Sequence, residues 1–522
     1  MTEIDPISLE IMRNQLEAVA EEMGQVLIRG AYSPNIKERR DCSTALFDAE
    51  GRLIAQAEHI PVHLGAMPEA VAAIGDRDPQ SGDVWLLNDP FRGGTHLPDL
   101  TMVSPITING DRFGFAVSRA HHADVGGMTP GSMPAGAREI YQEGLRIPPL
   151  RIVAGGEQNE DILELLLANV RNRAERAADL RAQIAANERA ETRLSALHAD
   201  YGTERLLAAF DAVVEYSKKR MENAIDELPT GTFEARDVLE GDGISTEDIP
   251  IQATVTIENR SVTVSFDGTA SQVAGNLNAP RAVTKSAVYF VIRAVTDPDI
   301  PPNHGCYLPV DVSIPAGSLL DPNPPAAVVG GNVETSQRVT DTVLSAFAKA
   351  VPDRLPAQSQ GTMNNLTIGS RDGEAFSYYE TIGGGFGARP TADGMDGVQV
   401  GMTNTLNTPI EALEAEYPLR VMRYALRAKS GGRGQFRGGD GIERRLKIEV
   451  PATVSLLTDR RRHPPGGVAG GENGACGENL VDGEPVGAKT TLEVEVGTTV
   501  TVRTPGGGGH GPPADDPDAE SS

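Results

Sequence analysis

Val84-Trp-Leu-Leu-Asn88 is a short apolar run, and Asp89-Pro-Phe-Arg-Gly-Gly-Thr-His-Leu-Pro-Asp99 follows it directly. The first segment predicts a buried strand, and the Gly- and Pro-rich second segment predicts a loop. Two further runs of strand type follow, at Thr101–Thr107 and Phe113–Ser118. The region therefore predicts a sheet whose strands end in polar loops.

A hairpin is predicted upstream of these strands, because Cys42–Asp48 and Gly51–Gln56 flank the turn Asp48-Ala-Glu-Gly51. Helices are predicted before and after these strands in the sequence, and two of them span residues 160–200 and 204–227. Asp5 followed by Pro6 is typical of a helix start. Apolar residues then recur at spacings of three and four, as in an amphipathic helix: Met12, Leu16, Val19, Met23 and Val26.

The rest of the chain mixes both element types. Strands are predicted at Ile251–Asp267 and Tyr307–Ile314, and helices at Pro280–Val295 and Gln337–Ala350. Short strands and glycine-rich turns fill Leu426–Val502. The sequence thus predicts an α+β fold, a large mixed α/β multidomain protein with a β-rich C-terminal part. Its expected divisions are a metal-site α/β domain with long helices (1–230), a mixed α/β domain (231–420), a β-rich module (421–505) and a disordered acidic tail (506–522).

Composition excludes several classes of function. The 522 residues carry a formal net charge of −26, which argues against a nucleic-acid partner because phosphates would repel such a surface. No apolar run reaches transmembrane length, and the charged N-terminus lacks the apolar core of a signal peptide. Three widely spaced cysteines do not suit a disulfide framework, so a cytoplasmic location is expected.

Candidate metal ligands gather near the predicted strand ends. His96 and Asp99 are three residues apart in the loop, His121 and His122 follow a strand, and Asp41 stands at the mouth of the hairpin. Two imidazoles and two carboxylates suit Zn, Mn or Fe(II) rather than an all-oxygen calcium site. Such a divalent metal, with a coordination position left open, makes water a nucleophile at neutral pH. The His-x-x-Asp spacing alone equally fits surface polar residues.

The adjacent pair His121 and His122 imposes a limit. In an extended chain the two side chains point to opposite faces, so at most one should be a ligand. The other could be a supporting partner, a proton donor or a structural histidine. His59 and His63 flank Ile-Pro-Val, and the proline favours a structural or supporting role for both. Cys42 adjoins Asp41 without an identifiable base, which favours a buried, inert thiol.

Several segments together resemble the hydantoinase B/oxoprolinase family, in the same order and over nearly the whole chain. The segments are Ile36–Ser43, His59–Gly65, Asn88–Asp99, His121–Gly127, Gly383–Gly387, Thr403–Thr405 with Glu411 and Glu414, and Thr504–Gly511.

The resemblance implies that two different subunits carry out separate steps of the reaction. A separate hydantoinase A-type subunit would bind ATP and phosphorylate the amide oxygen of a lactam or hydantoin such as 5-oxoproline. This chain would complete hydrolysis with a divalent metal, in a hetero-oligomer such as A2B2. Carried onto this sequence, the ligands would be Asp41, His96, Asp99 and His121, with His122 and Asp124 as catalytic neighbours that handle protons. The sequence has no Gly-x-x-x-x-Gly-Lys-Ser/Thr phosphate loop, in line with ATP on the partner.

Two other functions remain possible interpretations of the sequence. Acetone and acetophenone carboxylases use related A and B subunits, and a gene for a small third subunit beside this one would favour that reaction. A non-catalytic scaffold for the ATPase subunit is the second alternative. The joint presence of Asp41, His96, Asp99 and His121 speaks against the scaffold.

Overall fold

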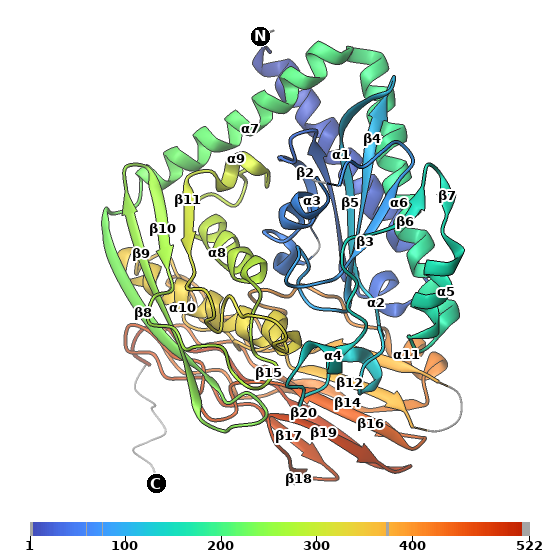
Figure 1. The fold of residues 1–522 in the computed structure, drawn as a ribbon. Coiled ribbons are helices and arrows are strands. Elements are labelled where there is room, and N and C mark those ends of the chain that lie inside the picture. The colour runs from blue at the N-terminus through green and yellow to red at the C-terminus, as the bar shows by residue number, and fades with distance from the viewer. Residues whose placement is uncertain (1–3, 59, 76, 372–374, 514–522) are drawn as a thin grey trace, which may run out of the picture.

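The computed structural model describes residues 4–58, 60–75, 77–371 and 375–513, and it confirms the α+β class. Figure 1 shows the N-terminal sheet beside long helices, a second sheet backed by helices, and the C-terminal strands gathered at the opposite end from the N-terminus. Within the described residues, no helix combines the length and the apolar character needed to cross a membrane.

The first sheet is formed entirely by the N-terminal third of the chain. Its strand order is β2 (Leu53–Glu58), β1 (Cys42–Asp48), β5 (Asp111–His121), β4 (Asp99–Ile108), β3 (Val84–Leu87), β6 (Leu150–Ala154) and β7 (Glu157–Gln158). The hairpin and the three strands expected from the sequence are all present. Neighbouring strands in this order are antiparallel, so the start of β4 lies beside the end of β5.

Helices cover both faces of this sheet. The helices of the first part are α1 (Pro6–Gly30), α2 (Pro34–Lys37), α3 (Met67–Gly75), α4 (Ile140–Glu143), α5 (Glu160–Ala168), α6 (Arg173–Tyr201) and α7 (Thr203–Asp226). Asp5 caps α1 by accepting from the backbone N–H groups of Ile7 and Ser8, with Pro6 at the first helical position. On β5, Ala116 and Ala120 pack toward α1 and α6, whereas Phe115 and Val117 pack toward α3.

A second sheet and its helices follow. The sheet order is β11 (Val310–Ser313), β10 (Ser261–Ser265), β9 (Asp248–Glu258) and β8 (Gly231–Glu240). Its helices are α8 (Arg281–Val295), α9 (His304–Tyr307) and α10 (Ser336–Ala350), and α10 packs against β8 and β9. The single strand expected over Ile251–Asp267 is a hairpin instead, because Asn259 and Arg260 take positive φ and turn the chain.

Two C-terminal sheets complete the fold. One has the order β13 (Ser377–Thr381), β12 (Asn365–Ser370), β16 (Ala452–Leu457) and β19 (Lys489–Val494). The other has β14 (Leu419–Arg427), β15 (Gly441–Ile448), β20 (Thr499–Arg503), β17 (Glu478–Val481) and β18 (Glu484–Pro485), with α11 (Ile410–Glu416) before it. Because β12 pairs with β16, the boundary expected near residue 420 runs through a shared sheet.

The expectation of a disordered tail from residue 506 does not hold for Gly506–Gly511. Their backbone N–H groups donate to carbonyls of separate loops, for example from Gly507 to Gly439 and from Gly508 to Gln358. A Cβ atom at Gly506 would lie 1.9 Å from the carbonyl oxygen of Ser430. Glycine therefore allows this segment to pack between loops, which composition alone does not reveal. Residues 514–522 lie outside the described part.

Candidate metal centre

Three neighbouring strands bring Asp41, Asp99 and His121 to one end of the first sheet. Asp99 opens β4 and pairs directly with His121, the last residue of β5. Asp41 precedes β1, and its backbone carbonyl accepts from the N–H of His121 at 3.0 Å. The sheet order β1-β5-β4 thus places three of the expected ligands at neighbouring strand ends.

His96 reaches the same point from the loop before β4. Its Nε2 lies 2.9 Å from Oδ1 of Asp99, and Nδ1 of His121 lies 3.2 Å from that same oxygen. One ligand atom from each of these three side chains lies within 4.8 Å of the other two. The structure therefore brings His96, Asp99 and His121 into one buried cluster, in which each side chain is at most 3% exposed.

The ring nitrogens of this cluster have the character of metal ligands. Nδ1 and Nε2 of His96 and Nε2 of His121 are buried without a hydrogen-bond partner in the described part of the chain. The 2.9 Å contact of His96 with Asp99 lacks hydrogen-bond geometry, as expected for two lone pairs directed at a common point. Donors about 2.1 Å from one ion lie about 3.4 Å apart in a tetrahedron. The distances of 2.9 and 3.2 Å from Oδ1 of Asp99 to the rings of His96 and His121 are close to this value. The residues fit a divalent ion that takes nitrogen and oxygen donors.

Asp41 is not part of this cluster, but it lines the cavity that contains the cluster, as His63 does. The cavity volume is about 20 Å³, enough for about one water-sized occupant. The remaining wall comes from several parts of the chain: Ile60, Val62, Asn332, Val333, Met363, Tyr379, Thr381, Thr403 and Thr405. The cavity therefore has room for an ion or a water, and a lactam ring can enter only if part of the wall moves.

Asp99 is fixed by a second set of contacts. Its Oδ2 accepts from the hydroxyl of Thr95 at 2.7 Å and lies 3.6 Å from Nε2 of His63. Nδ1 of His63 is hydrogen-bonded to the hydroxyl of Ser43 at 2.9 Å. His63 thus holds the supporting position expected for it, whereas His59 lies outside the described residues.

The surroundings favour the protonation states that bind metals. Burial by itself raises the pKa of Asp99, but the electrostatic influence of His96 and the contacts with His121, His63 and His96 hold that pKa well below its usual range. Burial lowers the pKa of His121, against an opposing hydrogen bond from Asp99. An anionic carboxylate and a neutral imidazole are the forms that coordinate a cation.

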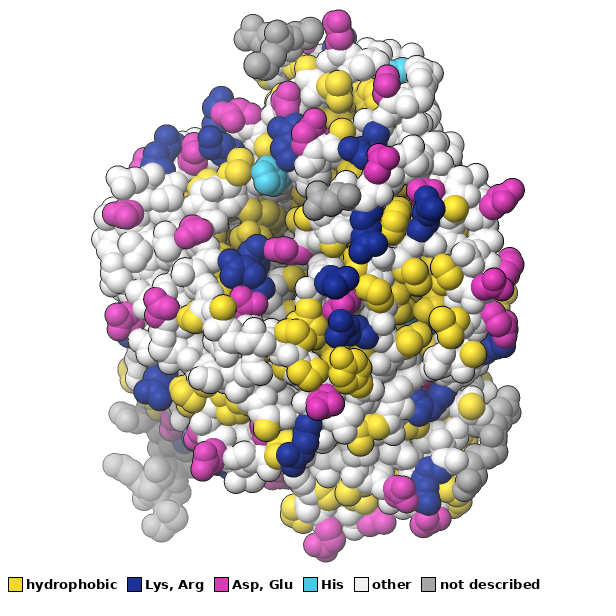
Figure 2. Space-filling model, in the orientation of Figure 1, with side chains coloured by type: hydrophobic (Ala, Val, Ile, Leu, Met, Phe, Trp, Pro, Cys, Tyr) yellow, Lys and Arg dark blue, Asp and Glu magenta, His cyan; other side chains and the backbone are white. Residues whose placement is uncertain are grey.

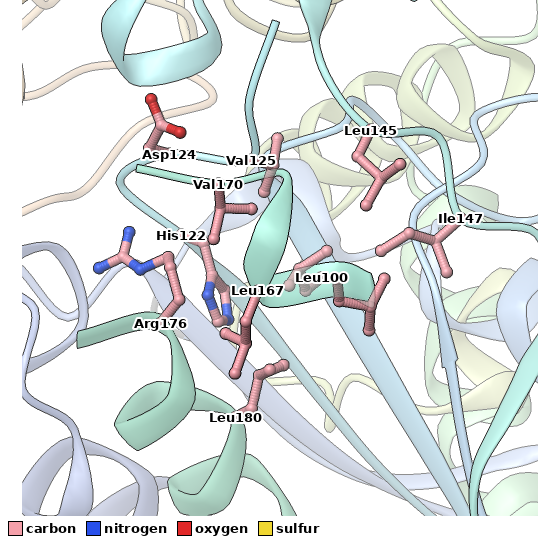
Figure 3. A pocket seen from close by; sticks show the side chains of 11 residues that line it. Leu100, His122, Asp124, Val125, Leu145, Ile147, Leu167, Val170, Arg176 and Leu180 are labelled. Atoms are coloured by element: carbon pink, nitrogen blue, oxygen red, sulfur yellow. The ribbon is translucent and has the colours of Figure 1, made fainter. Parts of the chain in front are cut away.

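The structure does not bring His122 or Asp124 to the cluster. The ring of His122 points to the α6 side of the sheet, where Nε2 is hydrogen-bonded to Gln183 at 3.0 Å. It lines a different, apolar cavity, and Figure 3 shows the Asp124 carboxylate pointing away from this ring. Asp124 accepts from the backbone N–H groups of Gly126 and Gly131 and pairs with Arg171 at 3.0 Å. His122 is therefore bonded to α6, and the Asp124 carboxylate is bonded to the loop that follows it and to Arg171.

Other residues of the wall are not identifiable from the sequence. The ring of Tyr379 stacks on His121, and the guanidinium of Arg39 lies 4.9 Å from the Tyr379 ring centroid on β13. Asn332 lies on a π-helical turn, Gly331–Thr335, and its Oδ1 is buried without a partner among the described residues. Such turns are frequent at functional sites, but neither a spacing nor a composition signal marks this one.

The surface gives little sign of this centre. Histidines are scarce on the face shown in Figure 2, because His63, His96, His121 and His122 are all at most 3% exposed. Basic and acidic side chains alternate over that face, with apolar side chains gathered near its middle. The candidate centre is therefore an interior site.

The chain is similar to known proteins over nearly its whole length. The family model Hydantoinase B/oxoprolinase matches residues 5–513. The 5-oxoprolinase 1 of Arabidopsis thaliana is 42% identical over 541 residues, which cover 97% of this chain and 42% of the plant protein. The chain thus spans about two fifths of the length of that relative.

Two solved structures share the fold. The crystal structure of an ATP-dependent caprolactamase from Pseudomonas jessenii matches with a TM-score of 0.91 at 31% identity, covering 98% of this chain and 92% of that one. A nucleotide-free acetone carboxylase matches with a TM-score of 0.86 at 18% identity, covering 97% of this chain and 76% of that one. The second likeness, at this identity, shows the fold alone. From the family match and these relatives, the chain belongs to the hydantoinase B/oxoprolinase family.

Proposed function

We propose that this chain is the hydrolytic B-type subunit of an ATP-dependent enzyme that opens lactam or hydantoin rings. The observation that carries the proposal is the buried cluster of His96, Asp99 and His121, with ring nitrogens that lack partners among the described residues. The names of a 5-oxoprolinase and a caprolactamase among the matching proteins support the class of substrate.

The proposed ligands are Asp41, His96, Asp99 and His121, and the proposed ion is Zn, Mn or Fe(II). When bound, such an ion supplies Lewis acidity and lowers the pKa of water to near neutrality. Asp99 contributes its negative charge, and its second oxygen accepts from Thr95 and lies 3.6 Å from Nε2 of His63. The stack on Tyr379 keeps the ring of His121 in a fixed orientation.

The chemistry explains why ATP is needed. An amide carbon is a poor electrophile because the nitrogen lone pair is delocalised onto the oxygen, and phosphorylation of that oxygen removes the delocalisation. A water oxygen then bonds to the ring carbon, the carbon–nitrogen bond breaks, and the nitrogen leaves as an amine after it gains a proton. Hydrolysis of the remaining acyl phosphate gives the carboxylate and phosphate. The proposal assigns no proton transfer to His122 or Asp124.

ATP binding is assigned to a partner A-type subunit, in a hetero-oligomer such as A2B2. The plant 5-oxoprolinase is more than twice as long as its matching region, which supports a second functional unit. This chain also lacks a Gly-x-x-x-x-Gly-Lys-Ser/Thr motif. A cytoplasmic location is part of the proposal, since the free thiols of Cys42, Cys306 and Cys476 suit a reducing compartment.

The test is to express this chain together with a hydantoinase A-type subunit and to assay 5-oxoproline, a hydantoin, caprolactam and acetone. We expect ATP-dependent ring opening of at least one cyclic amide, and loss of that activity when His96 is replaced by alanine. ATP-dependent carboxylation of acetone without amide hydrolysis would favour the carboxylase. Turnover that persists in His96→Ala would refute the role of the cluster.

A further inference from the structure

Two threonines and an arginine form a compact hydrogen-bonded group in the wall of the metal cavity. Nη2 of Arg39 donates to Oγ1 of Thr381 at 2.9 Å and to Oγ1 of Thr405 at 3.3 Å. The two hydroxyl oxygens lie 2.6 Å apart. Nη1 of Arg39 donates to the carbonyl of Tyr379, and the carbonyl of Arg39 accepts from the N–H of Leu406. Arg39 therefore holds both threonine segments in place.

The hydrogens of this group can be counted. Arg39 has no acceptor atom, so both threonine oxygens receive hydrogens from the guanidinium. Each threonine has a single hydroxyl hydrogen, and one of the two is used in the bond between Thr381 and Thr405. The other hydrogen finds no protein acceptor among the described residues. Because both threonines line the cavity, that O–H is free to donate to an occupant.

The charges around the cavity point to the kind of occupant. Arg39 and Arg119 are each at most 1% exposed, and among the described residues their guanidinium groups donate to hydroxyl and carbonyl oxygens and to no carboxylate. Their charges offset those of Asp41 and Asp99, and burial raises the pKa of nearby Glu334 to about 7, so a divalent ion would leave the site net positive. A dianionic phosphoryl group matches this charge, and a neutral amide does not.

We propose that the Thr381–Thr405 pair, oriented by Arg39, binds an oxygen of the phosphoryl group carried by the activated substrate once part of the cavity wall has moved to admit it. The inference rests on the proposed function for the presence of that group. A phosphoryl group is equally expected in the carboxylase alternative, so the site does not depend on which reaction follows. Donation from a hydroxyl polarised by a guanidinium is a strong, charge-assisted contact with an anionic oxygen.

Inorganic phosphate is the probe, and isothermal titration calorimetry of the full chain, with and without a divalent metal, is the measurement. Either threonine alone retains a free hydroxyl hydrogen, so Thr381→Val and Thr405→Val are each expected to weaken phosphate binding less than about tenfold. The double variant lacks that donor and is expected to lose about 10- to 100-fold. Thr342→Val is the matched control, since the buried hydroxyl of Thr342 bonds only within α10, to the carbonyl of Arg338.

Two results would overturn the proposal. One is a double variant that binds phosphate as tightly as the parent chain, and the other is a parent chain that binds no phosphate under either condition. Arg39→Lys separates positioning from folding: we expect weaker phosphate binding with unchanged metal content. An equal loss of metal and phosphate would make Arg39 structural and remove it from the proposal. Turnover is not needed for these readouts, so a wrong choice of reaction would leave them interpretable.

Discussion

The imidazole of His121 and the phenol ring of Tyr379 are stacked, with centroids 4.7 Å apart and planes inclined by 15°. The hydroxyl of Tyr379 donates to Oδ1 of Asn365 at 2.9 Å, and Nδ2 of Asn365 donates to Oε1 of Glu334 at 2.9 Å. A proposed ligand on the N-terminal sheet is thus held by a chain of contacts in the C-terminal half. The geometry of the candidate metal centre therefore depends on the packing between these two parts.

Replacing Tyr379 separates the stacking contact from the hydrogen bond. Tyr379→Phe keeps the ring but leaves buried Oδ1 of Asn365 without its donor, so the free energy of unfolding should fall by about 1–3 kcal/mol with little change in metal affinity. Tyr379→Leu removes the ring and should weaken metal binding by about 10–100-fold. Urea denaturation and chelator competition measure the two effects. Equal metal affinity in both variants would rule out the role of the stack.

Glu143 should make stability depend on pH. Burial raises its pKa to about 8, against hydrogen bonds from the N–H groups of Val329 and Val328. The unfolded chain has an ordinary glutamate pKa of about 4.3, so it releases the proton first as pH rises. The neutral acid of Glu143 makes its whole contribution to the free energy of unfolding below about pH 4.3. This contribution falls by about 1.4 kcal/mol per pH unit and levels off above about pH 8.

Glu143→Gln is the matched variant, because its amide imitates the neutral acid and its oxygen still accepts from Val328 and Val329. Denaturant unfolding between pH 5 and 8.5 should show the variant gaining stability over the parent chain as pH rises. A stability difference that stays constant across this range would contradict the assignment.

A buried carboxylate joins the middle of the chain to the C-terminal sheets. Asp459 accepts from Nη2 of Arg338 and Nζ of Lys489, both at 2.9 Å. Asp459→Ala leaves two buried cations without this partner and should lower the free energy of unfolding by about 3–5 kcal/mol. Asp248→Ala removes the surface contacts of Asp248 with Arg462 and His463 and should cost about 0–1 kcal/mol. Thermal or urea unfolding compares the two, and equal losses would refute the distinction.

Local pattern was sufficient for the elements that carry the proposed ligands. The apolar runs around the turn at Asp48–Gly51 correspond to β1 and β2, and the Gly- and Pro-rich loop before β4 contains His96. Alternation along an extended chain predicted that His121 and His122 point apart, and they lie in different cavities. These features depend only on neighbours in the sequence.

The far wall of the cavity could not be derived in the same way. Tyr379, Thr381 and Thr405 lie more than 250 residues after His121, and only the packing of the C-terminal sheets brings them there. The proton-handling role expected for His122 and Asp124 was implied by the family resemblance, which made them neighbours of His121. Proximity in sequence says little about a side chain on the opposite face of a strand.

Composition did not predict the ordered packing of Gly506–Gly511. A run of glycines before an acidic end is typical of disorder, yet a Cβ atom at any position of Gly506–Gly509 would lie 1.9–2.2 Å from a carbonyl oxygen of another loop. That use of glycine becomes visible only when the surrounding segments are in place.

The metal content of purified His96→Ala, measured by inductively coupled plasma mass spectrometry, tests the central claim most directly. His463→Ala is the control, because His463 is exposed and pairs with Asp248. The parent chain and the control should hold about one divalent ion per chain, and His96→Ala should hold almost none while its circular dichroism is unchanged. A folded His96→Ala protein with a full complement of metal would contradict the account.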